Sequence, residues 1–305
     1  MNATTGQDFT ELVHRLNDSS VRKRYEAFRD IDWNGPDSAI DPRDPRWRLP
    51  AVTPLGGTDW YRSLPGDVQS VFGLEWTCQV LRFGVSFEAC LTRGLLELAS
   101  VQPSDSPLLR YAMHEVIEES HHSMMFLELI RRSGCKPHDV PRTESFLQRH
   151  VVARWGATFP ELFFMCVLAG EVFIDHDNRE RLRGKDALHP LLRRVLQIHV
   201  TEEARHVCFA EGYLRERLPL LSSARRRAIA IAVPFVLRRG EEMMLRPPPS
   251  LIERYAIPRG ELARAFGPGS EHQRSVAKIT APILELVTWR LPRSRPSWRS
   301  SPSAS

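Results

Sequence analysis

The stretch His199-Val200-Thr201-Glu202-Glu203-Ala204-Arg205-His206 decides the fold of this chain. Glu203 and His206 are three residues apart and His199 precedes Glu203 by four, so a helix carries all three side chains on one face. A carboxylate and an imidazole one turn apart can bind the same metal ion, and a second imidazole in register adds a further donor. We therefore predict a metal-binding helix over residues 188–217.

A second Glu-x-x-His pair lies in Glu119-Ser120-His121-His122. Ala112, Val116 and Phe126 fall on the same helical side as Glu119 and His122. This apolar side favours an inward orientation for the pair, although Glu115 falls there too.

Two other matches to the same spacing are set aside. Glu11 and His14 belong to a polar N-terminal helix outside the predicted core. Glu118 and His121 overlap the chosen pair one residue out of register and face about 100° away on a helix. The spacing alone is a weak signal, so the apolar surroundings decide between the matches.

Two single glutamates interrupt apolar helical stripes. Glu88 has Leu and Val at helical spacings around it, and Glu171 lies in Leu168-Ala169-Gly170-Glu171-Val172-Phe173-Ile174. Burying an ionised carboxylate is costly unless it is paired or bound to a metal. Two single glutamates and two Glu-x-x-His pairs on four helices are the ligand set of ferritin-like di-iron or di-manganese bundles. We predict these four helices at residues 69–101, 106–133, 159–183 and 188–217.

The rest of the chain is predicted to surround this four-helix core. Residues 8–28 are expected to form an amphipathic helix, and the proline-rich residues 30–65 an extended arm that buries its aromatic side chains. Those side chains are Trp33, Trp47, Trp60 and Tyr61. Two further helices are expected at 223–245 and 271–291. We thus predict one all-α domain over residues 1–292, with helix and arm in 1–68, bundle core in 69–217 and peripheral helices in 223–291, followed by a disordered basic tail at 293–305.

The composition argues against several other functions. The net charge of +5 is spread along helices without an aromatic-interleaved basic motif, so we expect no nucleic-acid partner. The longest apolar run, residues 228–237, is too short to cross a bilayer, and no export signal is visible, so we expect a cytoplasmic protein away from the membrane. The 5 cysteines include no C-x-x-C pair, and phosphate-binding glycine motifs and a Gly-x-Ser-x-Gly elbow are missing from the sequence.

Over roughly residues 8–290, the sequence resembles the di-iron arylamine N-oxygenases, the family of p-aminobenzoate N-oxygenase. The resemblance is carried by Glu88, Glu119-x-x-His122 followed by Met124-Met125-Phe126, Glu171, and His199-x-x-x-Glu203-x-x-His206. The additional histidine, His199, is its distinctive mark. The resemblance implies a ferritin-like bundle, a homodimer, and two iron ions per chain with O2 as co-substrate.

The resemblance also implies a role for each of these residues. Glu88, Glu119 and His122 would bind one iron ion, and Glu171, His199, Glu203 and His206 the other, with Glu119 and Glu203 bridging the two. The family oxidises an aromatic amine to the hydroxylamine and on to the nitro product. Its reaction belongs to secondary metabolism, such as antibiotic biosynthesis, and takes electrons from an external donor.

Two other functions are compatible with the same ligand set. One is a non-catalytic ferritin-like iron-binding protein, and the other is a di-iron oxidase or desaturase that acts on a non-amine substrate. An iron store needs hydrophilic iron pathways, whereas an oxygenase needs a closed apolar pocket beside the metals. His199 favours the oxygenase, because a store does not require it.

A few other polar residues near the predicted ligands have two readings. Asp175, one turn after Glu171, is expected either to accept a hydrogen bond from a ligand histidine or to be a solvated acid. Glu115 is either such an acceptor or a ligand, and it stays outside the predicted set. His114, His121 and His176 have polar neighbours and are predicted to lie at the surface.

Overall fold

A computed structural model describes residues 3–184 and 187–288 of the chain. These residues form helices joined by turns and loops, and they contain no β-strand. The prediction of an all-α fold is therefore confirmed. None of the helices in the described part of the chain is long and apolar enough to cross a membrane.

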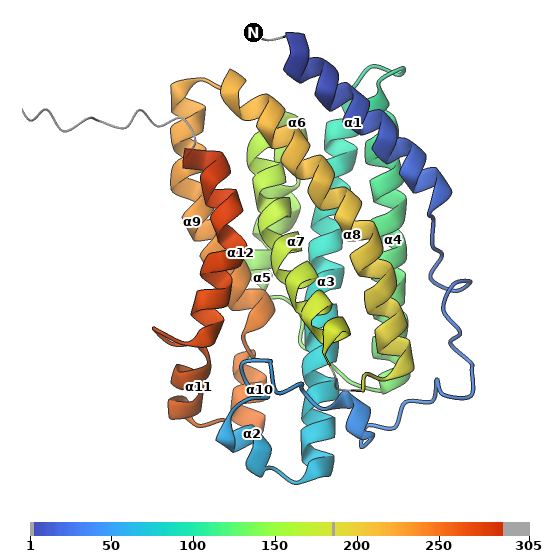
Figure 1. The fold of residues 1–305 in the computed structure, drawn as a ribbon, viewed down its shortest axis with the longest axis vertical. Coiled ribbons are helices and arrows are strands. Elements are labelled where there is room, and N and C mark those ends of the chain that lie inside the picture. Colours follow the sequence, from blue (N-terminus) through green and yellow to red (C-terminus); the bar gives the residue numbers. More distant parts are fainter. Residues whose placement is uncertain (1–2, 185–186, 289–305) are drawn as a thin grey trace, which may run out of the picture.

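Four long helices run side by side through the molecule (Figure 1). They are α3 (Gly66–Ser100), α4 (Pro107–Ser133), α7 (Pro160–Arg183) and α8 (Pro190–Arg217). α3 packs against α4 and α7, and α8 packs against α4 and α7, so each helix of the four contacts two others. The predicted ranges 69–101, 106–133, 159–183 and 188–217 differ from these bounds only at the helix ends, where assignments shift easily.

Local sequence signals set the ends of α4 clearly. The Ser106 hydroxyl accepts a hydrogen bond from the Leu108 N–H at 3.2 Å, and Pro107 occupies the first turn, where no N–H is needed. At the other end Gly134 has φ of 69°, the left-handed conformation that glycine adopts without strain. These caps fix the register of the helix that carries Glu119 and His122.

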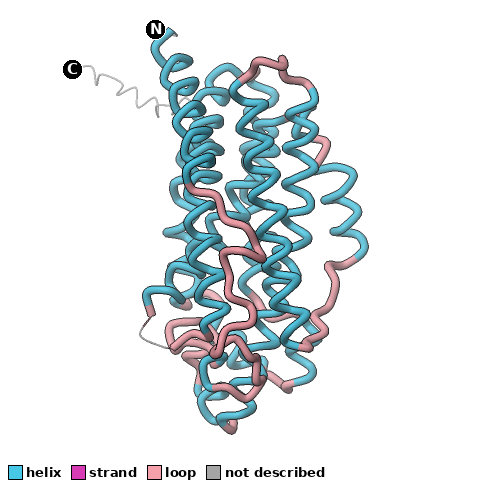
Figure 2. Tube along the Cα trace, turned by 90° about the vertical axis from the view of Figure 1, so that its right-hand side faces the viewer, coloured by secondary structure: helices cyan, strands magenta, loops and turns pink. Residues whose placement is uncertain are grey.

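The N-terminal helix α1 (Ala3–Arg22) lies across α4 and α8, and an arm then descends along the bundle (Figure 2). The prediction of a helix to residue 28 is wrong, because the Glu26 N–H is taken by the Asp30 carboxylate at 2.7 Å and the chain turns. Trp33 and Trp47 of the arm are buried, as expected. Trp47 stacks on His189 with ring centroids 4.4 Å apart, which fastens the arm to the start of α8.

An outer layer covers α7. It consists of α9 (Ser223–Leu245) and α12 (Glu271–Thr288), which pack against α7 and against each other. The predicted helix at 271–291 runs three residues past α12, and those residues lie outside the described part, as does the predicted tail at 293–305. The division of the chain at residues 68 and 217 stays a prediction.

Several short helices were not predicted from the sequence. They are η1 (Pro45–Trp47), α2 (Asp59–Ser63), α5 (Arg142–Leu147), the π-helical turn η2 (Gln148–Val152), α6 (Trp155–Thr158), η3 (Leu218–Leu220), α10 (Pro249–Arg254) and α11 (Arg259–Phe266). Most of them span fewer than two turns, which is too short for a helical period to be visible in the sequence.

Candidate metal centre

The seven predicted ligands meet inside the four-helix core. α3 supplies Glu88, α4 supplies Glu119 and His122, α7 supplies Glu171, and α8 supplies the other three. All seven residues are at most 1% exposed. Every one of them belongs to at least one group of three side chains whose ligand atoms lie within 4.8 Å of one another. The inward orientation inferred from the apolar stripes is thus what the structure has.

These groups of three overlap, and they divide the cluster unevenly. One consists of Glu88, His122 and His199, and a second of Glu115, Glu119 and His206. The other two are Glu119, His122 and Glu203, and Glu88, Glu119 and Glu171. Glu119 is shared by three of the four groups, as suits a carboxylate that bridges two metal positions.

His199 lies between Glu88 of α3 and Glu203 of its own helix, α8. Its Nε2 atom is 3.7 Å from a carboxylate oxygen of Glu88 and 3.7 Å from one of Glu203. The resemblance implied that His199 serves the same metal as Glu203 and His206. The grouping with Glu88 and His122 offers a different division, and the 3.7 Å contacts leave His199 within reach of either position.

Each histidine of the two Glu-x-x-His pairs contacts a carboxylate through both of its ring nitrogens. His122 Nδ1 faces Glu119 at 2.9 Å, and its Nε2–H donates to Glu202 at 3.0 Å. His206 repeats the arrangement, with Nδ1 facing Glu119 at 2.8 Å and Nε2–H donating to Glu118 at 2.8 Å. Each histidine therefore uses a carboxylate of the opposite helix to direct its Nδ1 atom into the cluster.

Glu118 and Glu202 are themselves joined by one cation. Arg205 is buried, and its guanidinium lies 2.8 Å from Glu118 and 3.4 Å from Glu202. The sequence analysis missed both acceptors, although a signal is present. A glutamate directly precedes the ligand glutamate in each pair, as Glu118-Glu119 and Glu202-Glu203.

Charge inside the cluster is poorly balanced by the protein alone. Burial, together with nearby carboxylates, raises the pKa of Glu88 and of Glu171 well above the usual range. Burial and Glu203 also oppose ionisation of Glu119, but His206 and His122 outweigh them and lower its pKa to about 2. Burial lowers the pKa of His199 to about 4, so this imidazole is neutral and free to act as a donor.

Several ligand atoms have no hydrogen-bond partner among the described residues. They include both carboxylate oxygens of Glu171, Oε2 of Glu88 and Nε2 of His199. Buried polar atoms are almost always satisfied, so a group of such atoms aimed at one point needs an explanation. Metal cations fit this donor set, because carboxylates and neutral imidazoles are the ligands of iron and manganese.

Of the two readings of Asp175, the structure favours an acid that is paired outside the cluster. Its carboxylate accepts a hydrogen bond from Arg179 Nε at 2.6 Å. Asn178 instead lies beside His199, with its amide nitrogen 3.4 Å from Nδ1. With that amide turned by 180°, its oxygen would accept a hydrogen bond from His199 Nδ1–H and leave Nε2 for a metal.

The three histidines predicted at the surface are partly buried. His121 accepts a hydrogen bond from the Ala27 N–H at 3.3 Å and so fastens the arm to α4. His176 contacts the Ser275 hydroxyl at 3.2 Å, between α7 and α12. His114 has its Nε2 atom buried. Their polar sequence neighbours predicted exposure, but contacts such as those with the arm and with α12 cannot be read from neighbouring residues.

Comparisons with known proteins agree with this geometry. The family described as P-aminobenzoate N-oxygenase AurF matches residues 6–289. The chain belongs to this family. Two uncharacterized proteins, one of Mycobacterium tuberculosis and one of Mycobacterium bovis, are each 36% identical to it over 318 aligned positions. The match covers 99% of this chain and 93% of each relative. The AurF family consists of di-iron proteins, and the resemblance inferred from the ligand motifs is confirmed.

Proposed function

We propose that this chain is an O2-dependent di-iron oxygenase that N-oxygenates an aromatic amine to its hydroxylamine or nitro product. The observation that carries the proposal is the buried cluster of four carboxylates and three imidazoles, in a chain of the AurF family. The seven predicted ligands, Glu88, Glu119, His122, Glu171, His199, Glu203 and His206, would hold the two ions.

The chain's own residues would prepare the site for this chemistry. The iron ions that these residues would hold would supply electrons and oxygen activation, and an external donor would restore their reduced state. Glu118 and Glu202 hold the imidazoles in one tautomer, and Arg205 contacts both carboxylates and offsets part of their charge. In each oxygenation one oxygen atom enters the amine and the other leaves as water, so two electrons and two protons are consumed.

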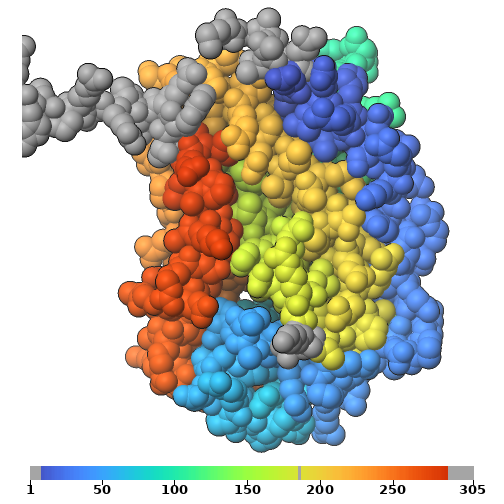
Figure 3. All heavy atoms as spheres, viewed as in Figure 1, coloured from blue at the N-terminus to red at the C-terminus, as the bar shows by residue number. Residues whose placement is uncertain are grey.

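A cavity of about 760 Å³, lined in part by residues of α7 and α3, gives a small molecule a place to bind. It is enclosed by the arm, α3, α7, α11 and α12, and Figure 3 shows the surface hollowed where the arm, α7 and α12 meet. Its lining includes Phe173, two residues after Glu171 on α7, and Val80 of α3, two helical turns before Glu88. Such a volume accommodates a substituted benzene ring.

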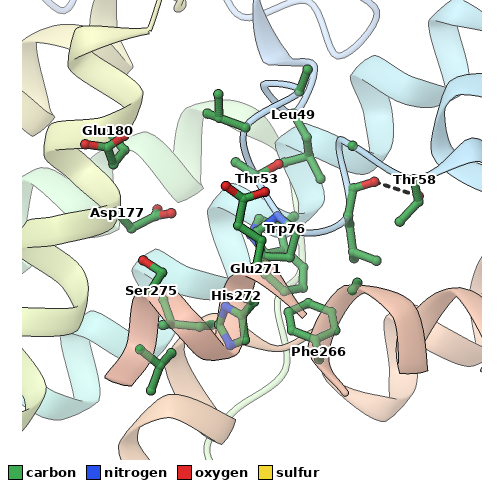
Figure 4. A pocket seen from close by; sticks show the side chains of 18 of the residues that line it. Leu49, Thr53, Thr58, Trp76, Asp177, Glu180, Phe266, Glu271, His272 and Ser275 are labelled. Carbon is green, nitrogen blue, oxygen red and sulfur yellow. Dashed lines mark hydrogen bonds between the residues drawn. The ribbon is translucent and has the colours of Figure 1, made fainter. Parts of the chain in front are cut away.

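The cavity is also lined by an arginine, Arg181, that forms no ion pair within the described part of the chain. Arg181 is 5% exposed, and it donates to the Thr77 hydroxyl at 3.1 Å, while its Nε has no partner among the described residues. Asp177, one turn earlier, faces the cavity with Glu271 (Figure 4). Burial raises the pKa of Asp177 even though Arg181 acts against it, so this acid is a weak counter-ion. An amine that also bears a carboxylate, such as p-aminobenzoate, suits this guanidinium.

The same family resemblance implies a homodimer, and α4 offers a surface for one. Met113, Ile117, Met124 and Leu127 are each 41–45% exposed on this helix. Their spacings of four, seven and three residues place them on one stripe, as in the seam between paired helices. We assign this stripe to contact with a second copy of the chain.

A turnover experiment tests the proposed reaction. The protein is loaded with Fe(II) without oxygen, reduced, and exposed to O2 with p-aminobenzoate or with aniline, which lacks the carboxylate. We expect hydroxylamine or nitro product from p-aminobenzoate, and less from aniline. Glu97→Gln, a change on α3 outside the cluster, is the matched control and should keep the activity.

The alternatives give different results in the same experiment. Oxygen consumption with no N-oxygenated product from any amine would contradict the proposal in favour of a non-amine substrate. Uptake of many iron ions per chain without turnover would point to an iron store.

A further inference from the structure

Glu115 is a buried acid beside the cluster that is not among the seven predicted ligands. It lies on α4 one turn before Glu119 and is 1% exposed. Neither of its carboxylate oxygens has a hydrogen-bond partner among the described residues. A buried carboxylate in this state is costly, and its position on the inner face of α4 prevents it from reaching water.

The groups around Glu115 do not neutralise it. Burial, opposed by His206 and reinforced by Glu119 and Glu203, raises the pKa of Glu115 to about 8. His206, whose ligand atom lies within 4.8 Å of Glu115, already contacts Glu118 and Glu119 at 2.8 Å. No arginine or lysine of the described residues lies within 4.0 Å of Glu115 as an ion pair. The protein alone therefore supplies no dedicated counter-charge.

The position of Glu115 is that of a metal donor. Ligand atoms of Glu115, Glu119 and His206 lie within 4.8 Å of one another. Donors about 2.1 Å from a metal ion lie at most about 4.2 Å apart, so small side-chain rotations bring the three onto one ion. Glu115 and Glu119 are four residues apart on one helix face, which suits two carboxylates that share a cation.

We propose that Glu115 is an eighth metal donor, which completes the position that Glu119 and His206 share. This inference rests on the proposed metal centre. It would add a carboxylate to this position, because Glu115, Glu119 and His206 form a carboxylate-rich group. Carboxylate oxygens favour harder ions such as Mn(II), whereas imidazole favours Fe(II) and later metals.

A Mn(II) titration tests this without any turnover. Metal-free protein is titrated in the absence of oxygen, and free aqueous Mn(II) is followed by its electron paramagnetic resonance signal. We expect wild type to bind two Mn(II) ions per chain. Glu115→Gln should lose at least tenfold in affinity at one position and keep the other, while Glu97→Gln should bind both ions as wild type does.

Thermal unfolding separates a lost ligand from a damaged fold. Without metal, Glu115→Gln should melt at or near the wild-type temperature, because the amide has nearly the same size and shape as the carboxyl group that it replaces. With saturating Mn(II) its melting temperature should rise less than that of wild type.

Two results would overturn the inference: unchanged Mn(II) affinities in Glu115→Gln, or binding of fewer than two ions by wild type. Failure of the amine assay alone would contradict only the proposed reaction, because the titration involves no amine.

Discussion

Each ligand histidine of the two Glu-x-x-His pairs is oriented by a carboxylate from the other helix. His122 of α4 donates to Glu202 of α8, and His206 of α8 donates to Glu118 of α4. Arg205 contacts both acceptors, so the two supports are one connected network. Replacing Glu118 or Glu202 should therefore change the metal affinity at the Glu-x-x-His pair of the other helix.

Glu202→Gln should weaken metal binding without removing a ligand. The amide keeps the shape of the side chain but lacks the charge that holds the His122 N–H, and losses of such supports typically cost about 10–100-fold in metal affinity. A Mn(II) titration measures the effect. Glu211→Gln, a more exposed change on the same helix, is the control, and equal affinities in the two variants would show that Glu202 has no such role.

His199→Ala should leave some metal bound and alter the site. Glu115, Glu119 and His206 remain as a group, whereas the group of Glu88, His122 and His199 loses a donor. We expect the iron content per chain to fall from two towards one, and the Mössbauer spectrum of the bound iron to change. Wild-type content together with a wild-type spectrum would mean that His199 only fills space.

That the seven predicted ligands meet in one buried cluster could be predicted, because spacing along one helix determines which side chains share a face. Their supports could not, because Glu118 meets His206 only through the packing of α4 on α8. Asp175 was proposed as a support for similar reasons of spacing, yet Arg179, one turn later, takes its carboxylate. Contacts between helices depend on rotations that one sequence does not reveal.

At the scale of the helices, α3 is positioned by close contacts that only glycine permits. A Cβ atom on Gly156 of α6 would overlap the backbone carbonyl of Gly94 on α3, and a Cβ atom on Gly94 would overlap the ring of Phe163 on α7. Glu88 lies on the same helix as Gly94. The close approach of these elements therefore helps to set the position of a ligand.

Gly156→Ala should destabilise the protein. The overlap with a backbone atom cannot be relieved by a side-chain rotation, and overpacking of this kind costs about 1–3 kcal/mol. Gly260→Ala is the matched control, because nothing lies within 4 Å of a Cβ atom there and alanine is the better helix former. Thermal unfolding should show a lower midpoint for Gly156→Ala alone, and equal midpoints would refute the packing argument.

The long helices could be predicted because their apolar periods extend over many turns. The short helices α2, α6 and α10 could not, since tertiary contacts rather than periodicity stabilise them. The end of α1 was also predicted wrongly, because a single hydrogen bond from Glu26 to Asp30 turns the chain where the pattern allowed the helix to continue.

At the scale of the whole molecule, the apolar stripe on α4 lies on the same helix as Glu115 and two of the seven predicted ligands. Ile117 and Met124 face outward, whereas Glu115, Glu119 and His122 face inward. A second copy on the outer face would hold α4 from both sides. Assembly and metal binding would then be linked through one helix.

The double change Ile117→Glu and Met124→Glu should convert a dimer to monomers. Like charges that face each other across an apolar interface are strongly unfavourable. Light scattering after size-exclusion chromatography measures the mass in solution. Val21→Glu, at another exposed apolar residue, should stay dimeric, and a wild-type chain that elutes as a monomer would refute the assignment of the stripe.

The most direct test of the metal centre is the iron content per chain. Metal-free wild type, Glu119→Ala and Glu97→Ala are each loaded with Fe(II) under nitrogen and desalted. The iron content of each protein is then measured by elemental mass spectrometry. We predict two iron ions per chain in wild type and in Glu97→Ala, and loss of both in Glu119→Ala, because Glu119 is shared by three of the four groups. Wild type with fewer than one ion, or Glu119→Ala with two, would contradict the account.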